Sequence, residues 1–115
     1  MPPNRRAQGR QAEDVAAAYL LNKGYTLITR RYTAPGGEID LIALRDGVLV
    51  FVEVKSSTRS SDAALLQVDE RKRQRFVQAA AHYLASADHP KLPARCDIIL
   101  VSPQGIRHLP DAFRG

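Results

Sequence analysis

Apolar residues near the start of the chain recur with the period of a helix. The spacing predicts a helix over about residues 9–23, followed by Gly24, where a left-handed C-terminal cap is favoured. Its apolar stripe, at i, i+3, i+4, i+7 and i+8, consists of Ala12, Val15, Ala16, Tyr19 and Leu20. Glu13 flanks this stripe instead of facing bulk water, which singles it out as a candidate for function. Residues 1–8 are polar and contain two prolines, so we expect them to be frayed.

The middle of the chain changes to runs of β-branched and aromatic residues, which are typical of strands. We expect strands over residues 25–32, 38–44 and 48–55, with a turn over residues 34–37. Asp46-Gly47 between two apolar runs is a strong signal for a tight hairpin. Residues 56–62 are predicted to form a polar loop.

A second helix and a further strand follow. The helix is predicted over about residues 69–87, with Phe76, Ala80, Tyr83 and Leu84 as its apolar seam. A strand is expected over residues 95–101, and residues 106–109 are a candidate short edge strand. The hairpin strands are apolar on both faces, which indicates a sheet covered on both sides. The predicted fold is therefore α/β, with three layers (α/β/α), the order α-β-β-β-α-β and a mixed central sheet, in one domain over residues 1–115.

The predicted hairpin gathers four charged residues. If its turn has two residues, the antiparallel register sets Asp40 directly opposite Glu53 and Glu38 directly opposite Lys55. Side chains alternate between the two faces of a strand, so all four would point to one side. Opposed Cβ atoms lie about 4.5–5.5 Å apart, a distance at which two carboxylates can share one divalent ion.

Two opposed carboxylates require a positive partner: Mg²⁺ or Mn²⁺, the Lys55 ammonium, or a proton on one of the acids. Hard oxygen ligands that leave coordination positions open suit Mg²⁺, which also binds substrate phosphate. Lys55 could then hold an attacking water or offset charge on the phosphate. The alternative is a structural one, in which Glu38 and Lys55 form a surface ion pair and Asp40 only caps its strand.

The overall charge indicates the class of ligand, and the single cysteine indicates the cellular compartment. A formal charge of +5 and a pI near 9.8, with an acidic cluster inside, suit a polyanion approached through a cation, although basic charge can also serve solubility alone. Cys96 is the only cysteine, so no intrachain disulfide is possible and a reducing compartment is the simpler assumption. With no signal-peptide pattern and no apolar run of about 20 residues, we expect a cytoplasmic protein without a membrane partner.

Basic residues near the second helix are the candidate nucleic-acid contacts: Lys72, Arg71, Arg75 and Arg59. Lys72 lies one helical turn before Phe76 on the seam, so it can turn toward the site. A solvated helix face is the alternative for this basic run. The three histidines, His82, His89 and His108, are scattered and have no zinc-ligand spacing with Cys96.

The segment Gly37-Glu38-Ile39-Asp40-Leu41-Ile42-Ala43, followed by Phe51-Val52-Glu53-Val54-Lys55, resembles the YraN-like family, or uncharacterised protein family 0102. The likeness extends to Glu13, Ala18, Tyr19-Leu20, Lys72, Arg95, Asp97 and Ala112-Phe113. It implies a restriction-endonuclease-like fold of the PD-(D/E)xK superfamily, similar to archaeal Holliday-junction resolvases. In that company Asp40 and Glu53 would be metal ligands, Lys55 the catalytic lysine and Glu13 an extra acidic residue.

Some positions depart from the pattern of that family. Ile39 stands where a proline often precedes the aspartate, and Ser56-Ser57 stands where basic residues often follow the lysine. Tyr32, Ala12 and Cys96 replace a frequent Asn, Gly and Phe. None of these changes removes a proposed ligand, but the two serines weaken the phosphate contact beside the site.

We therefore expect a Mg²⁺- or Mn²⁺-dependent nuclease that hydrolyses DNA phosphodiester bonds at branched or damaged structures. The ion would be held by Asp40, Glu53 and the Val54 backbone carbonyl, with Glu38 as a further candidate ligand. The likeness to resolvases suggests a homodimer. One alternative is a nucleic-acid-binding module of the same fold with little or no turnover, and another is a protein-interaction scaffold.

Overall fold

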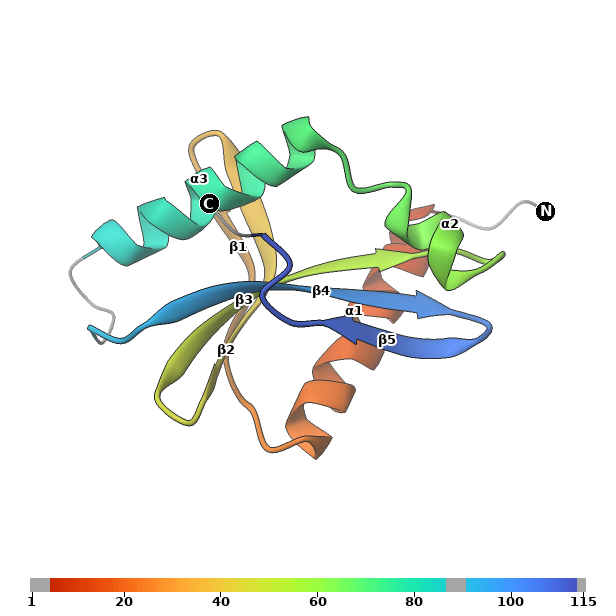
Figure 1. The fold of residues 1–115 in the computed structure, drawn as a ribbon, viewed down its shortest axis with the longest axis horizontal. Helices are drawn as coiled ribbons and strands as arrows, with labels where there is room; N and C mark the ends of the chain where they lie inside the picture. Colours follow the sequence, from red (N-terminus) through yellow and green to blue (C-terminus); the bar gives the residue numbers. More distant parts are fainter. Residues whose placement is uncertain (1–4, 87–90, 114–115) are drawn as a thin grey trace.

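Helices and strands follow one another nearly as the apolar pattern predicts (Figure 1). The structure is a computed structural model that describes residues 5–86 and 91–113, with side chains from residue 8 onward. The elements in chain order are α1 (Arg5–Asn22), β1 (Thr26–Ala34), β2 (Gly37–Arg45), β3 (Val48–Ser56), α2 (Ser61–Leu65), α3 (Glu70–Ala85), β4 (Ala94–Ser102) and β5 (Gly105–Leu109). None of the described helices is long and apolar enough to cross a bilayer.

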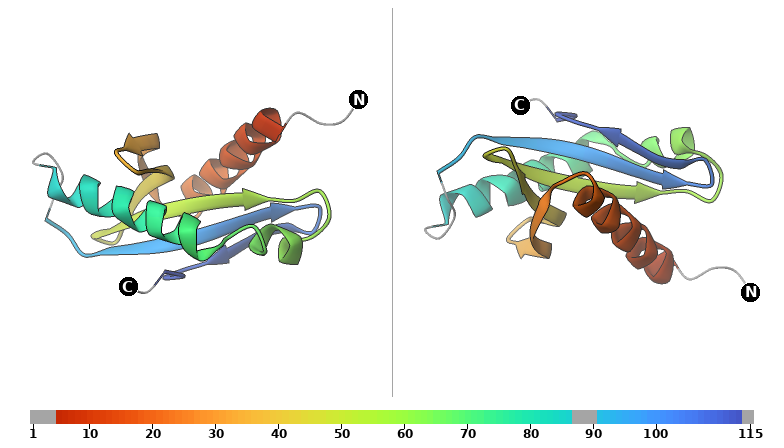
Figure 2. Two further views of the ribbon diagram at one scale, coloured as in Figure 1. Left: turned by 90° about the horizontal axis from the view of Figure 1, so that it is seen from above. Right: turned by 90° about the horizontal axis from the view of Figure 1, so that it is seen from below.

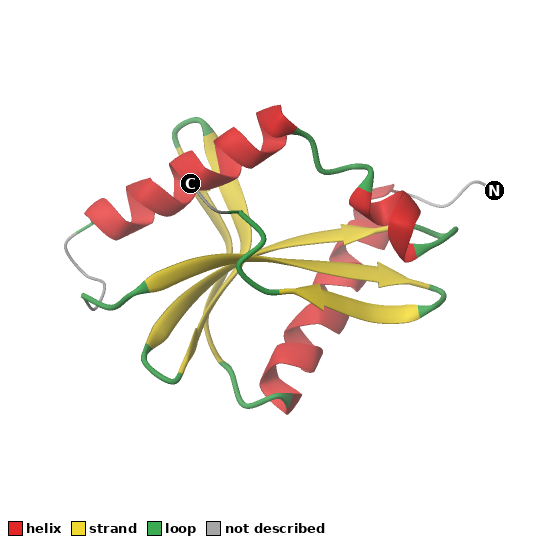
Figure 3. Cartoon of the chain, viewed as in Figure 1, coloured by secondary structure: helices red, strands yellow, loops and turns green. Residues whose placement is uncertain are grey.

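The five strands form one mixed sheet in the order β1-β2-β3-β4-β5 (Figure 3). All neighbouring pairs are antiparallel except β3 and β4, which are parallel. A parallel pair needs a crossover connection, and α2 and α3 supply it. The predicted α/β class, the mixed sheet and the edge strand near the C-terminus are confirmed.

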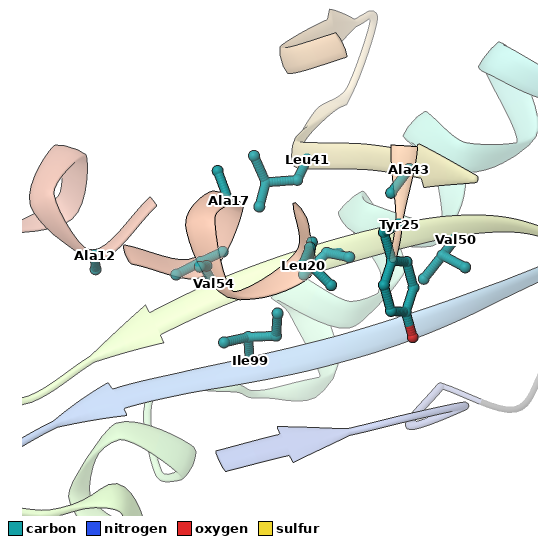
Figure 4. Close-up of a cluster of buried hydrophobic side chains, with 11 residues drawn as sticks. Ala12, Ala17, Leu20, Tyr25, Leu41, Ala43, Val50, Val54 and Ile99 are labelled. Carbon is teal, nitrogen blue, oxygen red and sulfur yellow. The ribbon is translucent and has the colours of Figure 1, made fainter. Parts of the chain in front are cut away.

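The face of the sheet that α1 covers holds the first hydrophobic cluster (Figure 4). The helix contributes Ala12, Ala16, Ala17 and Leu20, which pack on Tyr25, Leu41, Ala43, Val50, Val52, Val54 and Ile99. Val15 was expected in this stripe, but 41% of its surface is exposed. The helix is rotated so that Ala17 takes the buried place, and the expectation for Val15 was wrong.

A second cluster lies on the opposite face, beneath α2 and α3 (Figure 2). Alternation along β3 separates the two clusters, because Phe51 faces α3 while Val50 and Val52 face α1. From α3 the cluster includes Phe76, whose ring lies edge-on to Phe113 at a centroid distance of 5.3 Å. Both faces of the sheet therefore carry apolar packing.

The β2–β3 turn has the predicted geometry. Asp46 and Gly47 have φ values of 51° and 75°, the left-handed pair that a two-residue type I′ turn requires. Arg45 accordingly pairs with Val48, as the spacing predicts.

The segment between β3 and α3 differs from the prediction. The expected polar loop over residues 56–62 is interrupted by α2, whose N-cap Ser60 accepts a hydrogen bond on its side chain from the Ala63 amide. Ser60, followed by Ser61-Asp62-Ala63-Ala64, was a readable helix start. Elsewhere the strand and helix bounds shift by one to a few residues. Residues 1–4 of the segment expected to be frayed, residue 87 at the expected helix end and His89 lie outside the described residues, and α1 already begins at Arg5.

Helix α3 lies directly against the β1–β2 turn. A Cβ atom built on Gly37 would come within 2.2 Å of the backbone carbonyl oxygen of Arg75. Only glycine permits this approach, and it brings the first turns of α3 over the hairpin end that carries the candidate site.

Asp97, fully buried in β4, holds the C-terminal segment against this strand through hydrogen bonds. Its oxygens lie 2.7 Å from Nε2 of His108 and accept hydrogen bonds from Nε of Arg95 (3.0 Å) and the amide of Asp111 (2.9 Å). Burial alone would raise the pKa of Asp97, but the hydrogen bonds from His108, Arg95 and the Asp111 amide outweigh it and lower the pKa. His108 also meets the hydroxyl of Tyr19 at 3.2 Å, which ties β5 to α1.

Candidate active site

The pairing of strands β2 and β3 ends where the candidate site begins. Their paired register runs from Arg45 and Val48 to Leu41 and Val52 and stops there. The expected direct pairing of Asp40 with Glu53, and of Glu38 with Lys55, was therefore wrong. Glu38 pairs with Thr33 of β1 instead.

A bend in β2 at Asp40 explains the separation. Ile39 packs in the cluster beneath α3, whereas Leu41 packs in the cluster beneath α1. Two residues two apart on a regular strand share a face, so the alternation is broken at Asp40. Across β1, Arg31 has a φ of 54° at the same level. Because Ile39 and Leu41 pack in different clusters, the side chain of Asp40 is directed into the gap between β2 and β3.

In this gap the carboxylate of Asp40 replaces the missing strand partner. The Val54 amide donates a hydrogen bond to Oδ2 of Asp40 at 2.8 Å. In a strand, the N–H and C=O of one residue point to the same edge. The carbonyl oxygen of Val54 is therefore directed to the same gap, which is the position expected of a backbone metal ligand.

Glu53 and Lys55 form an ion pair inside the site. Nζ of Lys55 lies 2.9 Å from Oε1 of Glu53, and the two side chains are only 19% and 16% exposed. The alternative of a surface pair between Glu38 and Lys55 is wrong, because Lys55 contacts Glu53. That alternative also gave Asp40 the role of capping its strand. Asp40 does accept a hydrogen bond from the Val54 amide, and it lies in the acidic cluster as well.

Burial disfavours the ionised form of both carboxyl groups. Burial and the neighbouring charge of Glu53 raise the pKa of Asp40 from 3.8 to about 7, against the opposing hydrogen bond from Val54. Burial raises the pKa of Glu53 as well, although Lys55 partly offsets it. Of the neutralising groups that the sequence suggests, the Lys55 ammonium contacts Glu53, and the raised pKa of Asp40 makes protonation of that acid easier than usual. Such shifts are typical of functional sites.

Glu13 reaches the site from α1, as its position on the helix predicts. Its side chain is 13% exposed, and Oε1 accepts a hydrogen bond from Nε of Arg31 at 3.2 Å. The charge of Glu13 is among those that raise the pKa of Asp40. The two acids are therefore neighbours, with Arg31 as the counter-ion of Glu13.

These groups line a cleft of about 590 Å³ between α1, the hairpin and α3. Its lining residues are Gly9, Glu13, Thr33, Ala34, Gly36, Gly37, Glu38, Asp40, Glu53, Val54, Lys55, Lys72, Arg75 and Phe76. The structure thus brings together Asp40, Glu53, Lys55 and Glu13 with two of the four basic candidates, Lys72 and Arg75. The other two, Arg71 and Arg59, are exposed and line none of the cavities described here.

Two smaller cavities adjoin this cleft. One of about 310 Å³ includes Arg10, Arg31 and Glu38, and another of about 540 Å³ includes Lys55, Gln67 and Lys72. The sequence did not point to Gln67, because no local pattern says that the segment after α2 folds back over β3. Gly9, which lines all three cavities, also gave no signal beyond its place at the predicted helix start.

The model of the uncharacterised protein family UPF0102 matches residues 12–101. The chain belongs to the UPF0102 family. A UPF0102 protein of Rhodopseudomonas palustris (strain BisB18) is 46% identical over 107 residues, which are 91% of this chain and 78% of that protein. One of Bradyrhizobium sp. (strain ORS 278) is 47% identical over 107 residues (91% and 75%). One of Cupriavidus taiwanensis is 42% identical over 113 residues (96% and 86%).

The matched range of the UPF0102 family contains Glu13, Asp40, Glu53, Lys55 and Lys72. These relatives carry only the name of the family, which states no activity. What the site can do must therefore be argued from its geometry.

The residues of this UPF0102 site fit a hard divalent cation with few protein ligands. Within the described ranges, no three His, Cys, Asp or Glu side chains converge to hold a metal by themselves. Mg²⁺ needs no such cage, since one or two carboxylates with waters and substrate phosphate usually complete its shell. Burial and the charge of Glu53 raise the pKa of Asp40 to about 7, and a bound cation would favour the ionised form of this pair.

Proposed function

We propose that this protein is a metal-dependent nuclease, using Mg²⁺ or Mn²⁺ to hydrolyse DNA phosphodiester bonds. The observation that carries the proposal is the pair Asp40 and Glu53 in one cleft, with Asp40 bonded to the Val54 amide and Lys55 paired with Glu53. The pKa of Asp40 near 7 indicates that the pair is short of positive charge. The net charge of +5 on the whole chain suits a polyanionic substrate.

In this proposal each residue has a definite task. Asp40, Glu53 and the Val54 carbonyl would hold the cation, which would supply a water of lowered pKa and polarise the phosphate. Lys55, beside Glu53, would hold the attacking water or offset charge on the phosphate. Glu13 orients water from the α1 side, and Glu38 is a candidate for further ligation at the rim.

We further propose that the fold is of the restriction-endonuclease type, in the PD-(D/E)xK superfamily. An aspartate on β2, a Glu-x-Lys run on β3, and a helical crossover to the parallel strand β4 support this. Branched or damaged DNA as the substrate, and a homodimer, follow only from the likeness to resolvases. Cleavage assays and light scattering test these two points separately.

The decisive experiment compares nicking of junction, flap and duplex DNA with Mg²⁺ or Mn²⁺. The wild type should cleave at least one substrate, and Asp40→Ala and Lys55→Ala should abolish cleavage. Asp14→Ala is the matched control, because Asp14 is an exposed α1 carboxylate bonded to Arg30 and lines none of the cavities. No cleavage by the wild type, or equal cleavage by all variants, would rule out the proposed enzyme.

A second candidate is a nucleic-acid-binding module with little or no turnover. Ser56 and Ser57 favour it, because they line the cavity beside the site where basic residues would give a stronger phosphate contact. This candidate predicts salt-dependent DNA binding that is unchanged by Asp40→Asn and comes without cleavage. Calorimetric titration with Mn²⁺ separates the two, since only the nuclease needs the cation.

A further inference from the structure

The cavity of about 540 Å³ beside the candidate active site has the opposite chemistry to the acidic cleft. Its lining contains no carboxylate and consists of Gln8, Gly9, Val54, Lys55, Ser56, Ser57, Thr58, Gln67 and Lys72. Lys55, Val54 and Lys72 also line the acidic cleft, so the two spaces share a wall. We propose that this cavity, hereafter the lysine subsite, binds a phosphodiester group of a nucleic-acid strand next to the one held at Asp40 and Glu53.

Lys72 is the residue on which the lysine subsite depends. Its Nζ donates a hydrogen bond to the backbone carbonyl of Gln67 at 3.0 Å. In the described part of the chain, no carboxylate lies within ion-pair distance of this ammonium. A lysine held in place with its charge unpaired is a ready partner for phosphate.

Gln67 is the positioning residue for Lys72. Its side chain donates a hydrogen bond from Nε2 to the carbonyl of Ser56 at 2.8 Å, at the end of β3. The backbone N–H of Gln67 donates a hydrogen bond to the backbone carbonyl of Ala64 at 3.1 Å, which joins this segment to α2. These contacts fix the Gln67 carbonyl and, through it, the Lys72 ammonium in the cavity at the end of β3 that Lys55 also lines.

The remaining lining supplies neutral donors, which phosphate oxygens accept well. The hydroxyl-bearing residues Ser56, Ser57 and Thr58 line the cavity, and α1 contributes Gln8 and Gly9 to it. The serines that stand in place of basic residues after Lys55 carry no positive charge. The ammonium of Lys72 supplies a positive charge from α3 instead.

The inference rests on the proposed function for the reacting phosphate, but the lysine subsite itself needs no metal. Binding is therefore measured in EDTA, by fluorescence anisotropy of a short single-stranded oligonucleotide titrated with the full chain. Lys72→Gln should weaken binding about 10-fold, the loss expected for one charge-assisted contact. It should also lower the slope of log affinity against log salt by about 0.7.

Lys91→Gln is the matched control, because it removes the same charge by the same substitution at an exposed position that lines none of the cavities. General charge attraction predicts equal losses for the two variants, whereas the lysine subsite predicts a loss of about twofold or less for Lys91→Gln. Equal losses, or no binding by the wild type in EDTA, would overturn the inference. Such a result would leave the cleavage test of Asp40→Ala untouched, so the two proposals can fail separately.

The role of Gln67 is tested by a double-mutant cycle. Gln67→Ala should weaken binding by severalfold alone, and should cost almost nothing further in the Lys72→Gln background. Additive losses would mean that Gln67 does not act through Lys72. The melting temperature of each variant is recorded alongside, and a binding loss that follows stability instead of Lys72 also counts against the inference.

Discussion

The ammonium of Lys55 lies 2.9 Å from Glu53, while Asp40 in the same gap is held only by a backbone amide. One of the two carboxylates thus has a cationic partner and the other does not. Burial and the charge of Glu53 raise the pKa of Asp40 to about 7, and no direct cationic contact offsets them among the described residues, so the site is expected to bind a cation.

Added metal should stabilise the fold through Asp40. At 100 times the dissociation constant, Mn²⁺ contributes about 2.7 kcal/mol, which raises the Tm by on the order of 10 °C for a chain of this size. Differential scanning fluorimetry measures the shift, and Asp40→Asn should remove most of it. Asp14→Ala should keep the full shift. A shift that survives Asp40→Asn would mean that the cation binds elsewhere.

Without metal, stability should fall as pH rises through neutrality. The pKa of Asp40 is raised in the folded state, so the folded protein binds more protons than the unfolded chain. The contribution of Asp40 is fully present below about pH 4 and is lost as pH rises through about 7. Urea unfolding in EDTA from pH 5 to 8 measures it. Asp40→Asn should flatten the profile and make the protein more stable at pH 8, and a parallel profile would contradict the assignment.

Asp97 should show the opposite dependence on pH. Its pKa is lowered by its hydrogen bonds, so its contribution is present at neutral pH and lost as acid titrates the folded state below its usual pKa. Asp97→Ala leaves Arg95 without its partner and should cost about 3–5 kcal/mol in the free energy of unfolding. The exposed pair of Asp14 with Arg30 is the comparison, and Asp14→Ala should cost about 0.5 kcal/mol or less.

Gly37→Ala should disturb both stability and the cleft. The new methyl group would meet the Arg75 carbonyl, so α3 must shift, at a cost of about 1–3 kcal/mol. Gly9→Ala is the control within a helix: nothing lies within 4 Å of the added atom, and it should stabilise by up to about 1 kcal/mol. Chemical denaturation compares the two. Equal stability of Gly37→Ala and the wild type would mean that α3 moves freely against the turn.

The hairpin was predictable because its information is local. Apolar runs on both sides of Asp46-Gly47 define the strands and the turn, and the register of Arg45 with Val48 follows from them. The run Glu53-Val54-Lys55 then places two charged residues on the face toward α3. These statements need no knowledge of the rest of the chain.

The bend at Asp40 was not predictable in the same way. The bend arises because Ile39 packs in the hydrophobic cluster under α3 and Leu41 packs in the cluster under α1. Nothing in the hairpin sequence says where those helices pack. The contact of Gln67 with Ser56 is equally non-local, since it depends on the path of the chain after α2.

A single hairpin carries both Asp40 and Glu53, and this affects how the protein reaches its fold. Hairpins close within microseconds, well before a parallel strand such as β4 can join the sheet. The pairing of that hairpin ends at Leu41 and Val52, so Asp40 and Glu53 are buried together only when the two hydrophobic clusters pack beside them. A proton or a divalent cation relieves their repulsion at that late stage, so either should slow unfolding more than it speeds folding, which stopped-flow kinetics would measure.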